Sequence, residues 1–131
     1  MNTVEDKIRQ IPGAGHMHEI ARLVRIISKA RESGHDAWAD AAEDRACKMP
    51  LSVMVRVRDW VAPGAELKAD QYEILLLTTG GPAVRIFGRL NEYGEPETAE
   101  LQGQDWFTPW QRTHGQDADA LLDFARLFYF G

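Results

Sequence analysis

The chain is poor in the residues that would place it outside the cell or in a membrane. Its single cysteine, Cys47, excludes an internal disulfide, and one thiolate cannot build a thiolate zinc site. The longest apolar stretch lies around Ile74–Leu77 and is far too short to cross a bilayer. The N-terminal residues mix acids and bases without an apolar core, so they do not form a signal peptide. We therefore expect a cytoplasmic protein without a membrane span, metal or cofactor.

Signatures of nucleophilic catalysis and nucleotide binding are also missing. None of the three serines stands in a GxSxG elbow; they are Ser28, Ser33 and Ser52. Gly80 and Gly81 lie between two predicted strands, and no lysine follows them. A phosphate-binding loop needs GxxxxGK[ST] before a helix, so we interpret this pair as a hairpin turn. We assign no catalytic residue.

The histidines and the cysteine give no stronger signal. His16 and His18 diverge if they lie on a helix, because residues two apart do not face the same way. An extended His-x-His pair can bind a metal, but no HExxH motif follows, and surface histidines are the preferred interpretation. Cys47 falls late in a predicted helix on a packing face, where we expect a buried, unreactive thiol.

Charge and size describe one ordinary globular domain. The 131 residues include 20 acids and 15 bases, for a net charge of -5, which argues against direct nucleic-acid binding. Of the residues, 44% are hydrophobic and 27% charged, which is typical of a folded chain. We predict a single α+β domain over residues 1–131, with a helical front (1–49), an antiparallel sheet (51–107) and a C-terminal helix (117–129).

Helical spacing of apolar residues is clearest in the front of the chain. Residues 4–10 predict one or two short turns, and a longer helix is predicted from about His16 to Ser33, ended by Gly34. Its buried face carries Ile20, Leu23, Val24, Ile27 and Ala30. A second helix is predicted to start at a capping Asp36 and to end before Pro50. In the last helix, Asp117 is the predicted cap.

Between the helices the period changes to two, which predicts four strands near residues 51–58, 72–79, 83–90 and 98–106. The connections are short, so the strands should form an antiparallel meander whose apolar face is covered by the N-terminal and C-terminal helices. That face is predicted to carry Val53, Val55, Ile74, Leu76, Val84, Ile86 and Leu101. The other, solvated face is predicted to carry Arg56, Arg58, Glu73, Arg85, Arg89, Glu100, Gln102 and Gln104.

Two features indicate a surface that binds a partner. Trp60 ends the first predicted strand, and Trp106 and Trp110 leave the last one, so adjacent strand ends would group these rings near Tyr93. Such a group is either a corner of the core or an exposed anchor for another protein. The stretch from residue 92 to residue 105 contains five acids and no base, which is either a solvated face or an edge that docks on a basic partner. The candidate partner-binding residues are Glu92, Tyr93, Glu95, Glu97, Glu100, Asp105, Trp106 and Trp110.

Two strings in the middle of the chain resemble known sequences. They are PLSVMVRVRDWVAPG (residues 50–64) and YEILLLTTGGPAVRIFGRLNEYGEPETAELQGQDWFTPW (residues 72–110). They are similar to a group of small, uncharacterised proteins encoded by bacteriophages and prophages, and they cover about half of the chain. The group has no assigned activity, so the resemblance implies a phage-encoded origin and action in a bacterial cytoplasm, without site residues.

Together these observations predict a non-enzymatic binding protein. By analogy with anti-CRISPR proteins, we expect it to block a host defence or nucleic-acid-handling complex, so the expected partner is a host protein or ribonucleoprotein. Two alternatives stay open. One is a small-molecule site or enzyme near Trp60, Trp106 and Trp110, and the other is a self-associating phage accessory protein.

Overall fold

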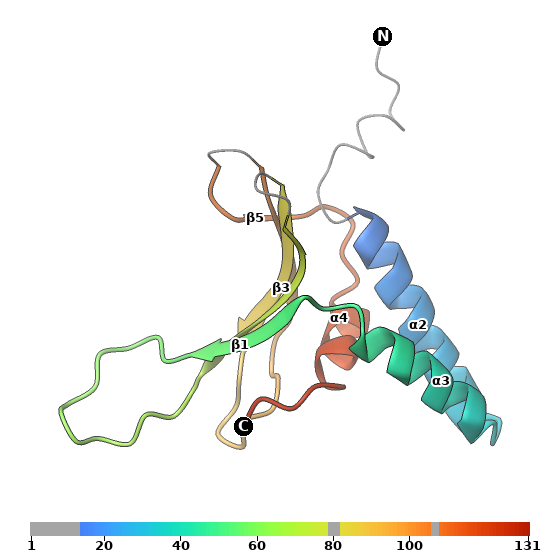
Figure 1. The fold of residues 1–131 in the computed structure, drawn as a ribbon, viewed down its shortest axis with the longest axis horizontal. Helices are drawn as coiled ribbons and strands as arrows, with labels where there is room; N and C mark the ends of the chain where they lie inside the picture. The colour runs from blue at the N-terminus through green and yellow to red at the C-terminus, as the bar shows by residue number, and fades with distance from the viewer. Residues whose placement is uncertain (1–13, 79–81, 106–107) are drawn as a thin grey trace, which may run out of the picture.

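The computed structural model describes residues 14–78, 82–105 and 108–131, and it has an α+β architecture (Figure 1). Three helices, α2 (Ala14–Glu32), α3 (Asp36–Cys47) and α4 (Ala118–Ala125), accompany one antiparallel sheet. The helical turns predicted at residues 4–10 and the hairpin glycines Gly80 and Gly81 lie outside the described residues.

The N-terminal helices form a hairpin joined by a short turn. α2 ends because Gly34 adopts a left-handed φ of 75°, which lets the His35 amide donate to the Ala30 carbonyl at 2.8 Å. Small buried residues of α3, Ala39, Ala42 and Ala46, face α2 and allow a close approach. One predicted detail is wrong: His35 precedes the helix, and Asp36 is its first residue rather than its cap. The Asp36 carboxylate instead lies 3.6 Å from the Arg31 guanidinium.

The sheet contains five strands in the order β1-β2-β3-β4-β5, each antiparallel to the next. They are β1 (Ser52–Arg56), β2 (Gln71–Thr78), β3 (Ala83–Arg89), β4 (Glu100–Gln104) and β5 (Gln111–Arg112). The prediction of four strands is therefore one short. β5 has only two residues, and a pattern of period two cannot be recognised in so short a segment.

One face of the sheet packs on the helices, which lie together on that side in Figure 1. Ile74, Ile86 and Leu101 are aligned across β2, β3 and β4 by the strand register and are fully buried. They share one core with α2 and α4, to which Ile20, Leu23, Leu121 and Phe124 contribute. α4 starts as predicted, because the Asp117 carboxylate accepts a hydrogen bond from the Ala120 amide at 3.1 Å.

The first strand departs from the prediction. Val53 and Val55 were expected beneath the helices, but 37% and 43% of their surfaces remain exposed. β1 is the terminal strand of the sheet, and the helix cover does not reach it fully. Beyond β1, residues 57–70 form an arm that projects from the body (Figure 1). Apolar alternation in this strand therefore marks a face that the single chain leaves partly uncovered.

Candidate protein-binding surface

The connection between β3 and β4 forms a tightly bonded turn. The Asn91 side-chain oxygen accepts hydrogen bonds from the amides of Tyr93 at 2.9 Å and Glu95 at 3.0 Å. The Asn91 amide donates to the Glu95 carbonyl at 2.8 Å, and Gly94 has a left-handed φ of 76°. These bonds use the local polar groups within the turn, so the turn holds its shape without help from a partner.

A close packing contact fixes the turn to the sheet. The Tyr72 hydroxyl donates to the Thr98 carbonyl at 2.6 Å, and the Thr98 hydroxyl accepts from the Arg89 amide at 3.0 Å. Gly88 lies beneath this crossing, where a side chain would collide with the Thr98 backbone. Burial raises the pKa of Tyr72, so its hydroxyl keeps the proton that it donates.

The turn presents an aromatic side chain among acids. Tyr93 is 76% exposed, and Glu92, Glu95 and Glu97 are exposed around it. None of these three carboxylates has an ion-pair partner among the described residues. Each is therefore available to a cation from outside the chain.

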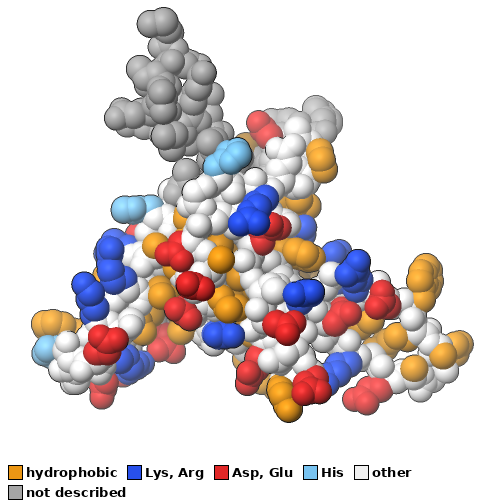
Figure 2. Space-filling model, turned by 180° about the vertical axis from the view of Figure 1, so that it is seen from behind, with side chains coloured by type: hydrophobic (Ala, Val, Ile, Leu, Met, Phe, Trp, Pro, Cys, Tyr) orange, Lys and Arg blue, Asp and Glu red, His pale blue; other side chains and the backbone are white. Residues whose placement is uncertain are grey.

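Half-open hollows flank the turn on two sides. One, of about 450 Å³, lies between the turn and the C-terminal segment that carries the exposed Tyr129. The other, of about 430 Å³, lies between the turn and the base of the arm, where Leu67 is exposed and Glu66 adds a carboxylate. We call Tyr93, Tyr129 and Leu67, with Glu66, Glu92, Glu95 and Glu97, the Tyr93 surface. Figure 2 shows acidic side chains along the lower edge of the molecule, beside the arm.

Two bases border the Tyr93 surface. Lys68 lines the hollow at the base of the arm, and Arg126 lines the hollow beside Tyr129. The Arg126 guanidinium is directed inward, since its Nε donates to the Pro96 carbonyl at 3.4 Å. Four carboxylates against two bases leave the Tyr93 surface acidic, in line with the net charge of -5.

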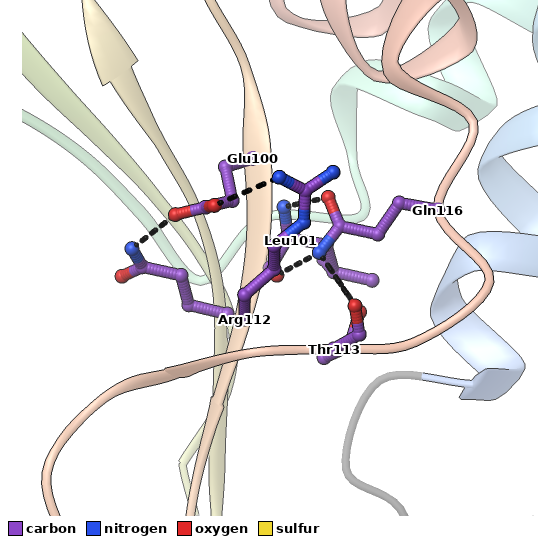
Figure 3. Close-up of polar contacts among 6 residues, drawn as sticks. Glu100, Leu101, Arg112, Thr113 and Gln116 are labelled. Atoms are coloured by element: carbon purple, nitrogen blue, oxygen red, sulfur yellow. Dashed lines mark hydrogen bonds and ion pairs between the residues drawn. The ribbon is translucent and has the colours of Figure 1, made fainter.

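The predicted acidic edge is divided by the strand register. Glu100 lies within β4 on the face that the helices leave open, where its carboxylate accepts from the Gln102 amide at 2.7 Å and lies 3.6 Å from Arg112 (Figure 3). Asp105 follows the end of β4, at the opposite end of the sheet from Glu97. Of the predicted acids, Glu92, Glu95 and Glu97 are brought together, and Glu100 and Asp105 are not.

The predicted group of tryptophans does not form between Trp60 and Trp110. Trp60 is fully exposed in the arm, near the end of the sheet where β1 stops and β2 starts. Trp110 precedes β5 at the other end and stacks on the Arg85 guanidinium at 4.2 Å. Trp106 lies outside the described residues. Tyr93 thus lies at the same end of the sheet as Trp60, away from Trp110.

The open face of the sheet is occupied by interactions within the chain. Arg85 forms an ion pair with Glu73 at 2.7 Å and donates to the Gln102 side chain at 2.8 Å. Its guanidinium also lies 4.7 Å from the Phe87 ring centre. This is the network expected of a solvated sheet face. A groove of about 190 Å³ lies beside Phe87 and Met54.

A side-chain clip joins the sheet to α4. The Gln116 amide nitrogen donates to the Leu101 carbonyl at 2.6 Å and to the Thr113 carbonyl at 3.0 Å, and its oxygen accepts from the Leu101 amide at 3.0 Å (Figure 3). The Thr113 amide bonds the same Leu101 carbonyl at 3.1 Å. Gln116 thereby continues the pairing of β4 where the strand β5 stops.

The remaining candidate groups are the histidines near the start of α2 and the cysteine at the end of α3. His16 is half-buried and burial lowers its pKa, whereas His18 is exposed. No three His, Cys, Asp or Glu side chains in the described part of the chain are grouped to hold a metal ion. Cys47 is exposed, which corrects the expected burial: the buried positions of α3 are Ala39, Ala42 and Ala46, and Cys47 is not among them. Partial burial raises the pKa of its thiol, and Glu43 and Asp44 add to the rise, so the thiol is not activated.

Sequence reasoning missed two apolar members of the Tyr93 surface. Tyr129 follows the last helix and Leu67 stands alone in a polar loop, so neither belongs to a periodic pattern. The signal that could have identified Leu67 is the presence of a large apolar residue within a polar loop.

Comparisons with protein-family models, with curated proteins and with solved structures found no match. Within the described residues, no helix combines the length and apolar character needed to cross a membrane.

Proposed function

We propose that the chain is a non-enzymatic binding protein that docks through the Tyr93 surface on a basic site of another protein. The observation that carries the proposal is the turn at residues 91–97, where internal hydrogen bonds hold Tyr93 outward beside three carboxylates that have no ion-pair partner within the described ranges. Tyrosine is enriched among the residues that dominate binding energy at protein interfaces, and a preformed turn loses little entropy on binding.

The partner's chemistry follows from the charge of this surface. Unpaired carboxylates around an exposed ring complement lysine and arginine side chains and raise the rate of encounter with them. A protein site that normally holds nucleic acid has this basic character. In its specific form, we propose that the chain is phage-encoded and blocks a host defence or nucleic-acid-handling complex in the bacterial cytoplasm, as anti-CRISPR proteins do. This specific form rests on the sequence resemblance and on the charge.

A capture experiment with charge-matched variants tests the proposal. The chain is immobilised and exposed to a bacterial lysate, and the captured proteins are compared with those captured by the variant Glu92→Lys/Glu95→Lys. The control Glu32→Lys/Asp123→Lys changes the net charge equally on exposed helical positions. We expect a specific partner to be lost with the first variant and kept with the control, and to be released by added nucleic acid.

Equal capture by both double variants would contradict docking through the Tyr93 surface. If added nucleic acid does not release the captured protein, the proposed competition for a nucleic-acid site is contradicted. Protein binding through the Tyr93 surface is not contradicted by that result. Melting temperatures close to that of the unchanged chain are expected for both variants, because all four positions are exposed.

We propose no small-molecule function for the open face. Pockets for drug-sized ligands usually measure about 300–1,000 Å³. The groove beside Phe87 is smaller, at about 190 Å³, and Arg85 is already bonded to Glu73 and Gln102.

A further inference from the structure

The unprotected edge of β1 points beyond the proposed function to a second binding surface. β1 is the terminal strand of the sheet, so one edge of its backbone has no strand neighbour in the described part of the chain. Exposed sheet edges are usually blunted by lysine, proline or a bulge. The centre of β1 is Val53-Met54-Val55 and has none of these devices. Leu51, just before the strand, is 59% exposed and Met54 is 60% exposed.

The apolar alternation of this segment is typical of a strand with one buried face. Val53 and Val55 point to the same face as the buried Ile74 and Tyr72 of β2, as the strand register requires. They nevertheless keep more than a third of their surface in contact with water. Such a pattern normally marks a covered face, and the helices of the same chain do not complete the cover.

A second copy of the chain completes the cover better than an arbitrary strand, because the segment is symmetric about Met54. In an antiparallel pair centred on Met54, Val53 of one copy lies opposite Val55 of the other, and Met54 lies opposite Met54. The same register places Leu51 opposite Val57 of the second copy. Every apolar residue of the segment then meets an apolar residue on the same face of the sheet.

The charges and the arm agree with this register. Arg56 lies opposite Ser52 of the second copy, so no like charges face one another across the pair. Continued past the strand, the same register places residues 58–60 opposite residues 48–50 of the other copy. The exposed Trp60 and Val61 of the arm, and the half-buried Met49 and Pro50, are thereby brought to the same contact.

The available surface is of the size that a dimer requires. A standard interface buries about 800 Å² on each partner, and a fully exposed tryptophan alone supplies on the order of 250 Å². Trp60 is fully exposed, and six further apolar residues from Leu51 to Val61 are exposed or half-buried. Together they supply several hundred Å² on each copy before any backbone or polar contact is included.

We infer that two copies of the chain associate through antiparallel pairing of their β1 strands, which joins the two sheets into one. The residues at the contact are Leu51, Val53, Met54, Val55, Val57 and Trp60. Most of the Tyr93 surface lies in the β3–β4 connection and at the C-terminal segment. Its two arm residues, Glu66 and Leu67, are not among the contact residues, so each copy keeps its own surface for the partner.

Charged substitutions of Met54, the residue on the proposed symmetry axis, test this inference. The unchanged chain is expected to have twice the 14.8 kDa chain mass by light scattering at about 100 μM, a concentration that detects micromolar association. Met54→Glu and Met54→Lys each place two like charges opposite one another, so each variant alone should associate at least tenfold more weakly. An equimolar mixture of the two variants should recover the dimer, because the opposed charges are then unlike.

The controls separate folding and partner binding from self-association. Tyr129→Lys removes an exposed aromatic residue away from β1 and should dimerise like the unchanged chain. A single-chain mass for the unchanged protein at about 100 μM would overturn the inference without reference to any variant. Failure of the mixture to dimerise while both single variants are folded monomers would also overturn it. Capture of the partner by Met54→Lys tests the proposed function independently.

Discussion

Replacing Gly88 by alanine should destabilise the protein more than any other glycine-to-alanine change for which the structure gives the surroundings. A Cβ atom at Gly88 would lie 2.8 Å from both the Thr98 carbonyl carbon and Tyr72 Cε1, and closer still to the Thr98 oxygen. Two of these three atoms belong to the backbone, so the contact cannot be relieved by rotating a side chain. Overpacking of this kind costs about 1–3 kcal/mol.

The shift of Thr98 that relieves this collision also weakens a hydrogen bond. Moving Thr98 away lengthens its 2.6 Å bond from the Tyr72 hydroxyl, which adds about 1 kcal/mol. The expected loss for Gly88→Ala is therefore about 2–4 kcal/mol, a large part of a typical total of about 5–15 kcal/mol. With a urea m-value near 2 kcal/mol/M, the unfolding midpoint should fall by about 1–2 M.

Two further variants isolate the cause. Tyr72→Phe removes only the hydrogen bond and should cost about 1 kcal/mol. Gly15→Ala adds a methyl group in a helix where nothing lies within 4 Å, so it should cause no loss. A loss below about 0.5 kcal/mol for Gly88→Ala would refute the claim that Thr98 crosses directly over this strand.

Two other predictions concern protonation and the open face. Burial lowers the pKa of His16 below its ordinary 6.5, so the unfolded chain takes up a proton that the folded chain does not as the pH falls through 6.5. The free energy of unfolding should therefore decrease from about pH 7.5 to about pH 5.5, and urea titrations should show a smaller decrease in His16→Gln than in the unchanged chain. An equal decrease in the two proteins would contradict the assignment. Arg85→Ala removes the Glu73 ion pair, the Gln102 bond and the stacking on Trp110, and should cost about 1–3 kcal/mol. Arg89→Ala on the same strand is the exposed control and should change stability by less than about 0.5 kcal/mol, so similar losses in the two would argue against the network.

The sequence predicted the elements whose signals are local. The spacing of Ile20 and Leu23 identified α2, the apolar run at Ile74 identified a central strand, and Asp117 identified the start of α4. Each signal depends on neighbours within a few residues along the chain, so it needs no knowledge of the tertiary structure.

Features that depend on register and distant contacts were not predictable in this way. The distance between Trp60 and Trp110 is set by which strand ends coincide, and the sequence pattern does not give that order. The Gln116 bonds to Leu101 join positions 15 residues apart through one side chain, which no periodicity records. For Val53 and Val55, the alternation correctly indicated an apolar face but did not tell which molecule covers it.

The Gln116 clip limits how far the sheet can grow. Because the Gln116 amide occupies both the Leu101 amide and its carbonyl, β4 offers no free bonds there to an incoming chain, and β5 has only two polar residues. Strand addition is therefore restricted to one side of the sheet. Each chain can therefore pair with only one neighbour through its sheet. Strand addition then ends at a closed assembly of finite size and cannot propagate into a fibre, although the β1 edge is apolar and uncovered.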